Sequence, residues 1–306
     1  MAERTPSRHE PGTALGAVGA FFRNRVAVNA GAAWQRLRSP QRWPAPHADH
    51  HTIPAWFWFI VVALAVLQVA VSFDEESVAW ARDLPDWVRN VFDVITDIGL
   101  SDWYLIPSGV LLVLFLFLDW QAVDRGLRAA WAEIAALAGY LFVAVAAGGI
   151  VTNIFKQIIG RNRPIGFDEN GWLAFDSFSF DYAYASFPSG HSTTAGAVMT
   201  VAALIFPRFR VPIVAFGLLV AFSRVVVGAH FPSDAVAGLA VGTAIAYVTA
   251  RWLARRRIAF EVNDGGHIRP RLAATREAAR ASLSRLLTAP VVALAGRSRN
   301  ARTTAD

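Results

Sequence analysis

Six long apolar runs, separated by polar segments, dominate the pattern of the chain. They cover residues 54–72, 103–118, 134–155, 190–206, 212–229 and 234–253. A helix needs roughly 20 apolar residues to cross the hydrocarbon core of a bilayer, and each run is close to that length. The pattern therefore predicts an all-α fold, a bundle of six transmembrane helices.

The composition agrees with a membrane protein. The 306 residues are 55% hydrophobic and 17% charged, whereas soluble domains are about 25% charged. The missing charge indicates a surface that faces lipid rather than water. We therefore expect a polar, disordered N-terminal tail at 1–53, a six-helix membrane domain at 54–253, and a basic C-terminal tail at 254–306.

The distribution of positive charge predicts the orientation. Of the 29 Lys and Arg residues, 23 lie in residues 1–53 and 251–306 and in the short loops at 119–133 and 207–211. Positive residues collect on the cytoplasmic side of a membrane, so both termini are expected in the cytoplasm. The loop at 73–102 is acidic and falls on the outer side.

Three clusters of polar residues lie at the predicted outer ends of spans three to six. They are residues 156–164, 188–191 and 223–234. Charged side chains at these depths are rare and by default mark a functional site. An up-and-down path brings these ends into one layer, so we expect an active site at the extracytoplasmic ends of helices 3 to 6.

The first property of these clusters is positive charge. Lys156, Arg163 and Arg224 supply fixed charge and many donors, which suits a tetrahedral oxyanion such as phosphate. Lys156 is also the only Lys in the chain. Ser189 and Gly190 precede a predicted helix, where free backbone N–H groups favour an anion. The residues together predict a phosphate-binding pocket.

Two histidines and one aspartate remain in the clusters. Asp234 follows His230 by four residues, and a carboxylate at that position can hold the imidazole in one tautomer and raise the nucleophilicity of its free nitrogen. His191, on another helix, is then available to protonate a leaving oxygen. We expect His230, His191 and Asp234 to be the catalytic residues.

The spacing of these residues resembles that of a known family. Lys156 is followed after six residues by Arg163 and Pro, then by Pro-Ser-Gly-His at 188–191, then by Ser-Arg, five residues, His230, three residues and Asp234. This is similar to the three-part signature of the type 2 phosphatidic acid phosphatase superfamily, which includes vanadium haloperoxidases and acid phosphatases. The six spans resemble its bacterial integral-membrane branch.

The resemblance implies an order of steps and a role for each signature residue. His230 attacks phosphorus to form a phosphohistidine, with Asp234 hydrogen-bonded behind it. His191 protonates the leaving group and then activates water. The resemblance implies no metal and no cofactor. The residues that would hold the phosphate oxygens are Lys156, Arg163, Arg224, Ser189 and the backbone of Gly190.

A pocket at the membrane interface suits a substrate whose apolar part stays in the bilayer. We expect a lipid phosphatase that hydrolyses a phosphate monoester or diphosphate, with undecaprenyl diphosphate or a phosphatidate-type lipid as substrate. The alternatives are a lipid phosphotransferase and a lipid A phosphatase, which would use the same phosphoenzyme site. The expected partners are this lipid and the bilayer of the bacterial inner membrane, and no nucleic acid.

Two further interpretations fit the motifs less well. A vanadium haloperoxidase would place vanadate in the same pocket, but six spans and an interfacial site argue against it. A transporter or lipid-binding scaffold with an inactive pocket predicts a missing signature residue, and every signature residue is present. The aromatic loop at 157–189 leaves two interpretations open, an interfacial belt or a lid at a lipid entrance.

Overall fold

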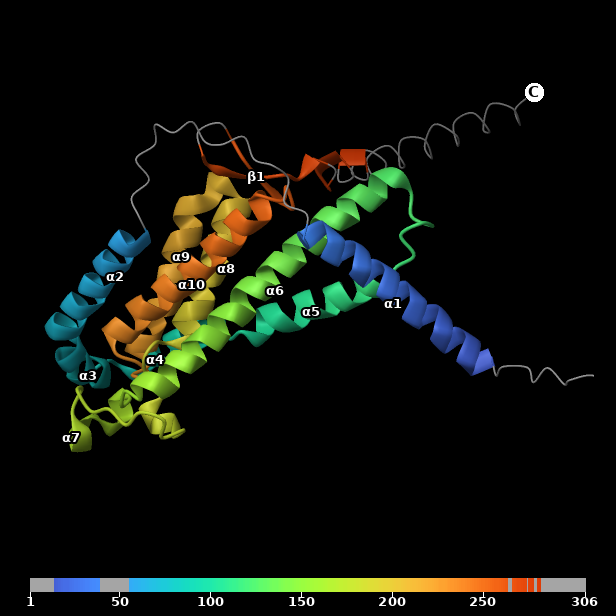
Figure 1. Ribbon diagram of the computed structural model, residues 1–306. Coiled ribbons are helices and arrows are strands. Elements are labelled where there is room, and N and C mark those ends of the chain that lie inside the picture. The colour runs from blue at the N-terminus through green and yellow to red at the C-terminus, as the bar shows by residue number, and fades with distance from the viewer. Residues whose placement is uncertain (1–13, 39–54, 264–265, 274, 278–279, 282–306) are drawn as a thin grey trace, which may run out of the picture.

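The computed structural model describes residues 14–38, 55–263, 266–273, 275–277 and 280–281, and it is mostly helical (Figure 1). Helices α2, α3 and α4 are Ala55–Val69, Glu75–Arg82 and Asp86–Asp97, with a π-helical turn at Ala70–Asp74 between the first two. The remaining long helices are α1 (Ala14–Arg38), α5 (Asp102–Phe117), α6 (Arg125–Ile159), α8 (Gly190–Ile205), α9 (Arg210–Val226) and α10 (Pro232–Ala254). The short elements are α7 (Phe167–Asn170) and three 3-10 turns at Pro164–Gly166, Tyr182–Tyr184 and Pro207–Phe209.

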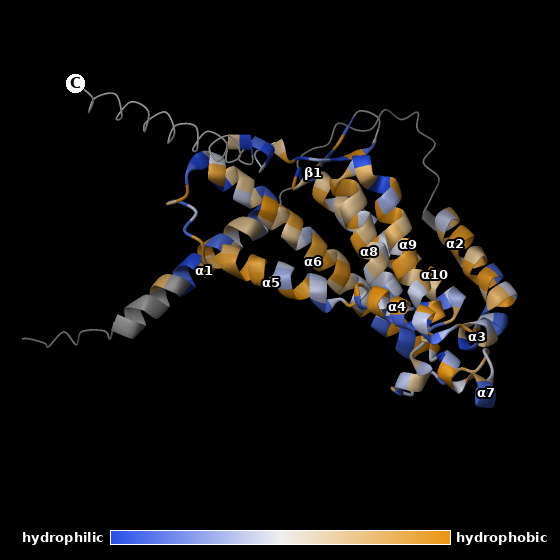
Figure 2. Ribbon diagram, turned by 180° about the vertical axis from the view of Figure 1, so that it is seen from behind, coloured by the Kyte–Doolittle hydropathy of each residue, from blue (hydrophilic) through white to orange (hydrophobic). Residues whose placement is uncertain are grey.

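The described residues contain five helical segments that are long and apolar enough to cross a membrane. They are Phe57–Arg82, Asp86–Phe117, Arg125–Ile159, Pro207–Val226 and Pro232–Ala254. The chain is therefore an integral membrane protein, and in Figure 2 hydrophobic residues run along these helices. The run predicted as the fourth span forms α8, which has only 16 residues and packs between α6, α9 and α10.

Small residues let α8 and α10 cross closely, and this crossing positions the site. A Cβ added at Gly242 would lie 2.0 Å from the carbonyl oxygen of Thr193, and one at Gly238 would lie 2.4 Å from that of Ser189. Glycine at such positions allows two membrane helices to approach within backbone contact. The N-terminal ends of α8 and α10 consequently lie side by side.

Two segments in the first third of the chain differ from the sequence predictions. The acidic loop expected at 73–102 contains α3 and α4. The N-terminal tail expected to be disordered contains α1, whose Asn29 donates from Nδ2 to the carbonyl oxygens of Leu116 (2.8 Å) and Leu118 (3.0 Å). The rest of that tail, residues 1–13 and 39–53, lies outside the described residues.

The C-terminal tail also begins with ordered structure, which corrects the all-α prediction. Strands β1 (Phe260–Val262) and β2 (Ile268–Pro270) form an antiparallel hairpin. Phe260 is buried, and its ring meets that of Tyr140 with centroids 5.1 Å apart. Part of the hydrophobic core therefore comes from this hairpin. Residues 282–306 lie outside the described part of the tail.

Candidate active site

The loop between α9 and α10 lies at the end of the bundle opposite the β-hairpin, near α3 and α4 (Figure 1). The loop between α9 and α10 carries His230 there, and Pro232 begins α10. Polar residues gather at this end in Figure 2. The arrangement agrees with one layer formed by the ends of several helices.

His230 and Asp234 are both buried and face each other. Nδ1 of His230 lies 3.6 Å from Oδ2 of Asp234. That carboxylate oxygen also accepts from the backbone N–H of Phe231 (3.0 Å) and from Oγ of Ser186 (2.5 Å). Asp234 is thus fixed by neighbours on both sides, in a position from which a carboxylate can orient the imidazole.

The other imidazole nitrogen faces the positive side chains. Nε2 of His230 lies 3.5 Å from Nη1 of Arg163. Burial lowers the pKa of His230 to about 4, although Asp234 opposes this shift. The imidazole is therefore neutral near pH 7, the form in which Nε2 can act as a nucleophile.

Arg163 is held rigidly beside His230. Its guanidinium donates to the carbonyl oxygens of Tyr182 (3.0 Å), Ala185 (3.1 Å) and Ala229 (3.3 Å), and it stacks on the ring of Tyr182 with Cζ 3.9 Å from the centroid. These partners are carbonyl oxygens and a ring rather than a carboxylate, so the positive charge of Arg163 is left for an anion.

Arg224 and Lys156 add charge to the same region. Nη1 of Arg224 donates to Oγ1 of Thr96 (2.7 Å), while its buried Nε has no hydrogen-bond partner in the described structure. Lys156, near the end of α6, lies within electrostatic range of Arg163, Arg224 and Asp234. A buried donor without a protein partner, next to other cations, is suited to an anionic ligand.

The start of α8 completes the layer. Ser189 caps the helix by accepting from the backbone N–H of Ser192 (3.4 Å), and its own N–H donates to the carbonyl oxygen of Asp234 (3.0 Å). A Cβ added at Gly190 would lie 3.9 Å from Nζ of Lys156. His191 lies within electrostatic range of Lys156, Arg163, Arg224 and His230. All eight predicted site residues therefore come together.

The structure also shows a buried network that the sequence analysis did not assign. Arg161 donates from Nη1 to Asp234 Oδ1 (2.8 Å) and Ser233 Oγ (2.7 Å), and from Nη2 to Asp74 Oδ2 (2.8 Å). Asp74 also accepts from the backbone N–H of Ser233 (3.0 Å). A charged residue five positions after Lys156 was the only sequence signal for Arg161, and nothing local connects it to Asp74.

A cavity of about 270 Å³ borders His230, and α3, α4 and the loop after α9 form its walls. Its positive residues are Arg82 and Arg89, which pair with Asp168 (2.8 Å) and Asp86 (2.7 Å). Among the described residues there is no cluster of three or more His, Asp or Glu side chains suited to a metal. The donor set around His230 is cationic and suits an anionic ligand.

The aromatic loop between α6 and α8 is joined to the site by backbone hydrogen bonds. The N–H of Arg163 donates to Ala183 O (2.8 Å), and that of Ser186 donates to Arg161 O (3.0 Å). Phe178 and Phe180 are exposed at 61% and 76%. Such exposure is compatible with both the belt and the lid interpretation, and each stays a prediction.

Comparison with known proteins gives matches over the same region. The sequence profile of the PAP2 superfamily matches residues 137–258, which include all eight predicted site residues. Lipid A 1-phosphatase of Rhizobium etli is 36% identical over 222 residues, 70% of this chain and 93% of the relative. That of Rhizobium johnstonii is 38% identical over 191 residues, 61% of this chain and 76% of the relative.

One solved structure also matches. It is the crystal structure of a transmembrane PAP2-type phosphatidylglycerolphosphate phosphatase from Bacillus subtilis, which is 23% identical. The match covers 63% of this chain and 91% of that chain, with a TM-score of 0.42.

Proposed function

Because the chain belongs to the PAP2 superfamily and is a membrane lipid phosphatase, we propose that it removes the 1-phosphate of lipid A. The family and the phosphoric ester hydrolase activity expected from the motifs are confirmed by these matches. The observation that carries the substrate proposal is the identity of 36% and 38% to two lipid A 1-phosphatases. The alternative named from the sequence is thus better supported than undecaprenyl diphosphate or a phosphatidate.

The first chemical step uses the two histidines on opposite sides of phosphorus. The lone pair on Nε2 of His230 forms a bond to phosphorus while the bond from phosphorus to the sugar oxygen breaks. The negative charge of the bound phosphate favours the protonated form of His191, which gives its proton to that oxygen, so the dephosphorylated lipid leaves as a neutral alcohol. The product on the protein is a phosphohistidine, supported by the neutral, buried state of His230.

The second step regenerates the enzyme. His191, now neutral, accepts a proton from water as the water oxygen attacks phosphorus, and the bond from phosphorus to Nε2 breaks. Inorganic phosphate is released. Lys156, Arg163, Arg224, Ser189 and the backbone N–H of Gly190 hold the phosphate oxygens in both steps, because positive charge and N–H donors stabilise the charge of the transition state.

The experiment that tests this proposal measures phosphate release by the purified protein in detergent with EDTA present. The substrates are lipid A, undecaprenyl diphosphate, phosphatidate and phosphatidylglycerophosphate. We expect lipid A to be hydrolysed fastest, and His230→Ala to abolish release. His267→Ala is the matched control, since His267 is exposed beside the β-hairpin.

Several outcomes would contradict the proposal. Release by His230→Ala at the wild-type rate would remove the phosphohistidine mechanism. Faster hydrolysis of another lipid in the panel would overturn the substrate. The phosphotransferase alternative predicts that phosphate appears on an added acceptor lipid instead of as free phosphate, which chromatography of the radiolabelled lipids distinguishes.

A further inference from the structure

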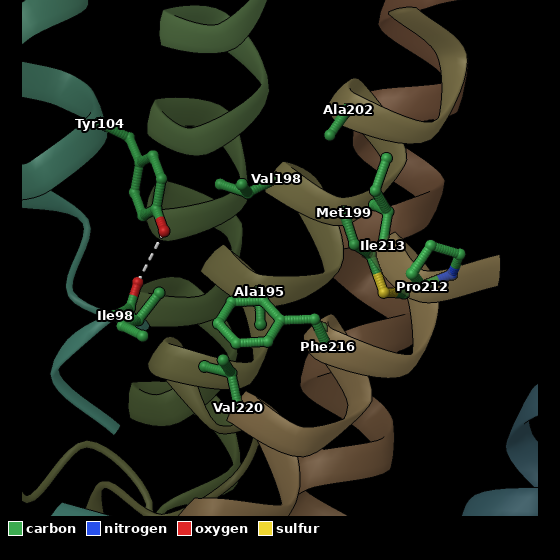
Figure 3. Close-up of a pocket in the computed structure, with 11 residues that line it drawn as sticks. Ile98, Tyr104, Ala195, Val198, Met199, Ala202, Pro212, Ile213, Phe216 and Val220 are labelled. Atoms are coloured by element: carbon green, nitrogen blue, oxygen red, sulfur yellow. Dashed lines mark hydrogen bonds between the residues drawn. The ribbon is translucent and has the colours of Figure 1, made fainter. Parts of the chain in front are cut away.

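An apolar cleft of about 340 Å³ lies between α8 and α9, and the end of α4 and the start of α5 contribute to it. Figure 3 shows Ala195 and Val198 of α8 opposite Phe216 and Val220 of α9. The hydroxyl of Tyr104 donates to the carbonyl oxygen of Ile98 (2.8 Å), so the phenol already has a partner inside the protein. The cleft therefore presents an almost wholly hydrocarbon lining.

The two helices that line the cleft also carry residues of the candidate active site. Ala195 lies four residues after His191 on α8, and Val220 lies four residues before Arg224 on α9. Residues four apart share one face of a helix. The faces that line the cleft therefore carry His191 and Arg224 one turn farther along, at the site.

The α4 side of the cleft also reaches His191. Ile98 lines the cleft, and a Cβ added at the next residue, Gly99, would lie 3.0 Å from Cβ of His191. The end of the cleft at Ile98 is thus next to the residue that packs on His191. Along α8 the lining extends from Ala195 to Ala202, a length of about 10 Å at 1.5 Å per residue.

The chemistry of the reaction says which part of a substrate enters this cleft. In phosphoryl transfer the attacking and leaving groups lie roughly in line on opposite sides of phosphorus. With His230 as nucleophile, the leaving lipid lies on the side of His191, and its hydrocarbon part must continue from there into an apolar environment. The cleft between α8 and α9, whose lining begins one helical turn after His191, is such an environment.

We propose that the cleft between α8 and α9 binds an acyl chain of the lipid substrate; the inference rests on the proposed function. The chain enters beside His191 and extends toward Ala202 between the two helices. The cleft then selects for acylated substrates and holds the leaving oxygen next to the acid that protonates it. A phosphorylated head group without chains uses only the phosphate site.

The test shortens the cleft at its far end. Ala202→Phe places a ring at the end of the lining, while Ala215→Phe, at an exposed position of α9 outside the lining, is the matched control. The substrates are intact lipid A and its completely deacylated disaccharide bisphosphate. We expect Ala202→Phe to lower kcat/KM for intact lipid A about tenfold, since it displaces a few methylene groups, and to change that for the deacylated substrate less than about twofold.

The outcomes separate this inference from the proposed function. If wild type hydrolyses neither substrate, the proposed function fails and the inference fails with it. If wild type hydrolyses lipid A and Ala202→Phe behaves like Ala215→Phe, the cleft inference alone is wrong. An equal loss on both substrates would also overturn it, because it would show a general structural effect.

A binding measurement supports the same conclusion without turnover. The chain has no Cys, so Val198→Cys in the His230→Ala background gives a single thiol inside the cleft. We expect lipid A to slow the reaction of this thiol with an apolar maleimide at least fivefold, and inorganic phosphate to leave it unchanged. Equal protection by phosphatidylcholine would assign the cleft to ordinary bilayer lipid and overturn the proposal.

Discussion

Arg161 and Asp74 form a buried ion pair, with Nη2 2.8 Å from Oδ2, and the same guanidinium reaches Asp234 through Nη1. Asp74 ends the π-helical turn between α2 and α3, whereas Arg161 follows α6. The first membrane-spanning segment is thereby tied to the carboxylate that lies 3.6 Å from Nδ1 of His230. We interpret Arg161 and Asp74 as positioning residues, because they act on the nucleophile only through Asp234.

Asp74→Asn tests this positioning role. The amide keeps the shape of the side chain but removes the charge that holds Arg161 in place. We expect kcat for lipid A to fall about a hundredfold, a loss typical of a misplacement near 1 Å, with KM changed less than about twofold. Steady-state kinetics in detergent would measure both parameters.

Asp168→Asn is the matched control for this variant. Asp168 also pairs with an arginine, Arg82, but both side chains are exposed at 49% or more. Exposed ion pairs contribute little, so the control should leave kcat unchanged. A rise in KM with kcat preserved in Asp74→Asn would show that the pair serves binding and would contradict the positioning role.

The pH dependence of the free enzyme follows from the environment of His230. Burial lowers its pKa to about 4, below the ordinary value near 6.5. A histidine attacks as the neutral base, so activity is present above its pKa and lost as the pH falls through it. In the pH profile of kcat/KM, we expect the inflection caused by His230 to lie near pH 4 and not near pH 6.5.

The measurement needs one correction. A phosphate monoester has a second pKa of about 6, so the substrate is titrated separately and its inflection is assigned first. An enzyme inflection near 6.5 after this correction would mean that His230 is solvated in the working protein. That result would remove the argument that burial keeps the nucleophile neutral.

The site residues were accessible from sequence because each motif is local. Ser189 to His191 and His230 to Asp234 are short runs whose geometry follows from a helix start. An up-and-down path was then enough to bring the runs together. Asp74 and Arg161 are 87 residues apart, and no periodicity or spacing encodes such a contact. The partner of Arg161 therefore required the structure.

The errors in the fold prediction also have physical causes. The apolar runs correctly predicted the long helices, because helices that face lipid are apolar over most of their surface. Helices α3 and α4 were missed, since charged and apolar residues alternate in them and the mean hydropathy of the segment is low. Each strand of the β-hairpin has three residues. A strand is recognised in a sequence by alternating apolar and polar residues, and three residues are too few to show that alternation.

Lys156→Arg tests why the chain uses its single Lys at this position. A guanidinium is larger and planar, whereas an ammonium is a compact point charge. A Cβ added at Gly190 would lie 3.9 Å from Nζ of Lys156, so a longer side chain would enter the volume expected for phosphate. We expect KM to rise about tenfold. Arg208→Lys, in the turn between α8 and α9, should change nothing, and an unaffected KM in Lys156→Arg would contradict this account of the pocket.

Gly242→Ala tests whether the close crossing of α8 and α10 sets the geometry of the site. The added Cβ would lie 2.0 Å from Thr193 O and 2.7 Å from Ala197 N, so the helices must separate. Overpacking of this kind destabilises by about 1–3 kcal/mol. We expect Tm in detergent to fall by about 5 °C.

Activity should fall in the same variant, because separation of the helices breaks the bond from Ser189 N–H to Asp234 O. Gly149→Ala on α6 is the matched control, since a Cβ there meets nothing within 4 Å, and it should preserve both Tm and kcat. If Gly242→Ala lost stability but kept full kcat, the position of Asp234 would depend on Arg161 and Ser186 rather than on the helix crossing. The Asp74→Asn variant would then show the larger catalytic defect of the two.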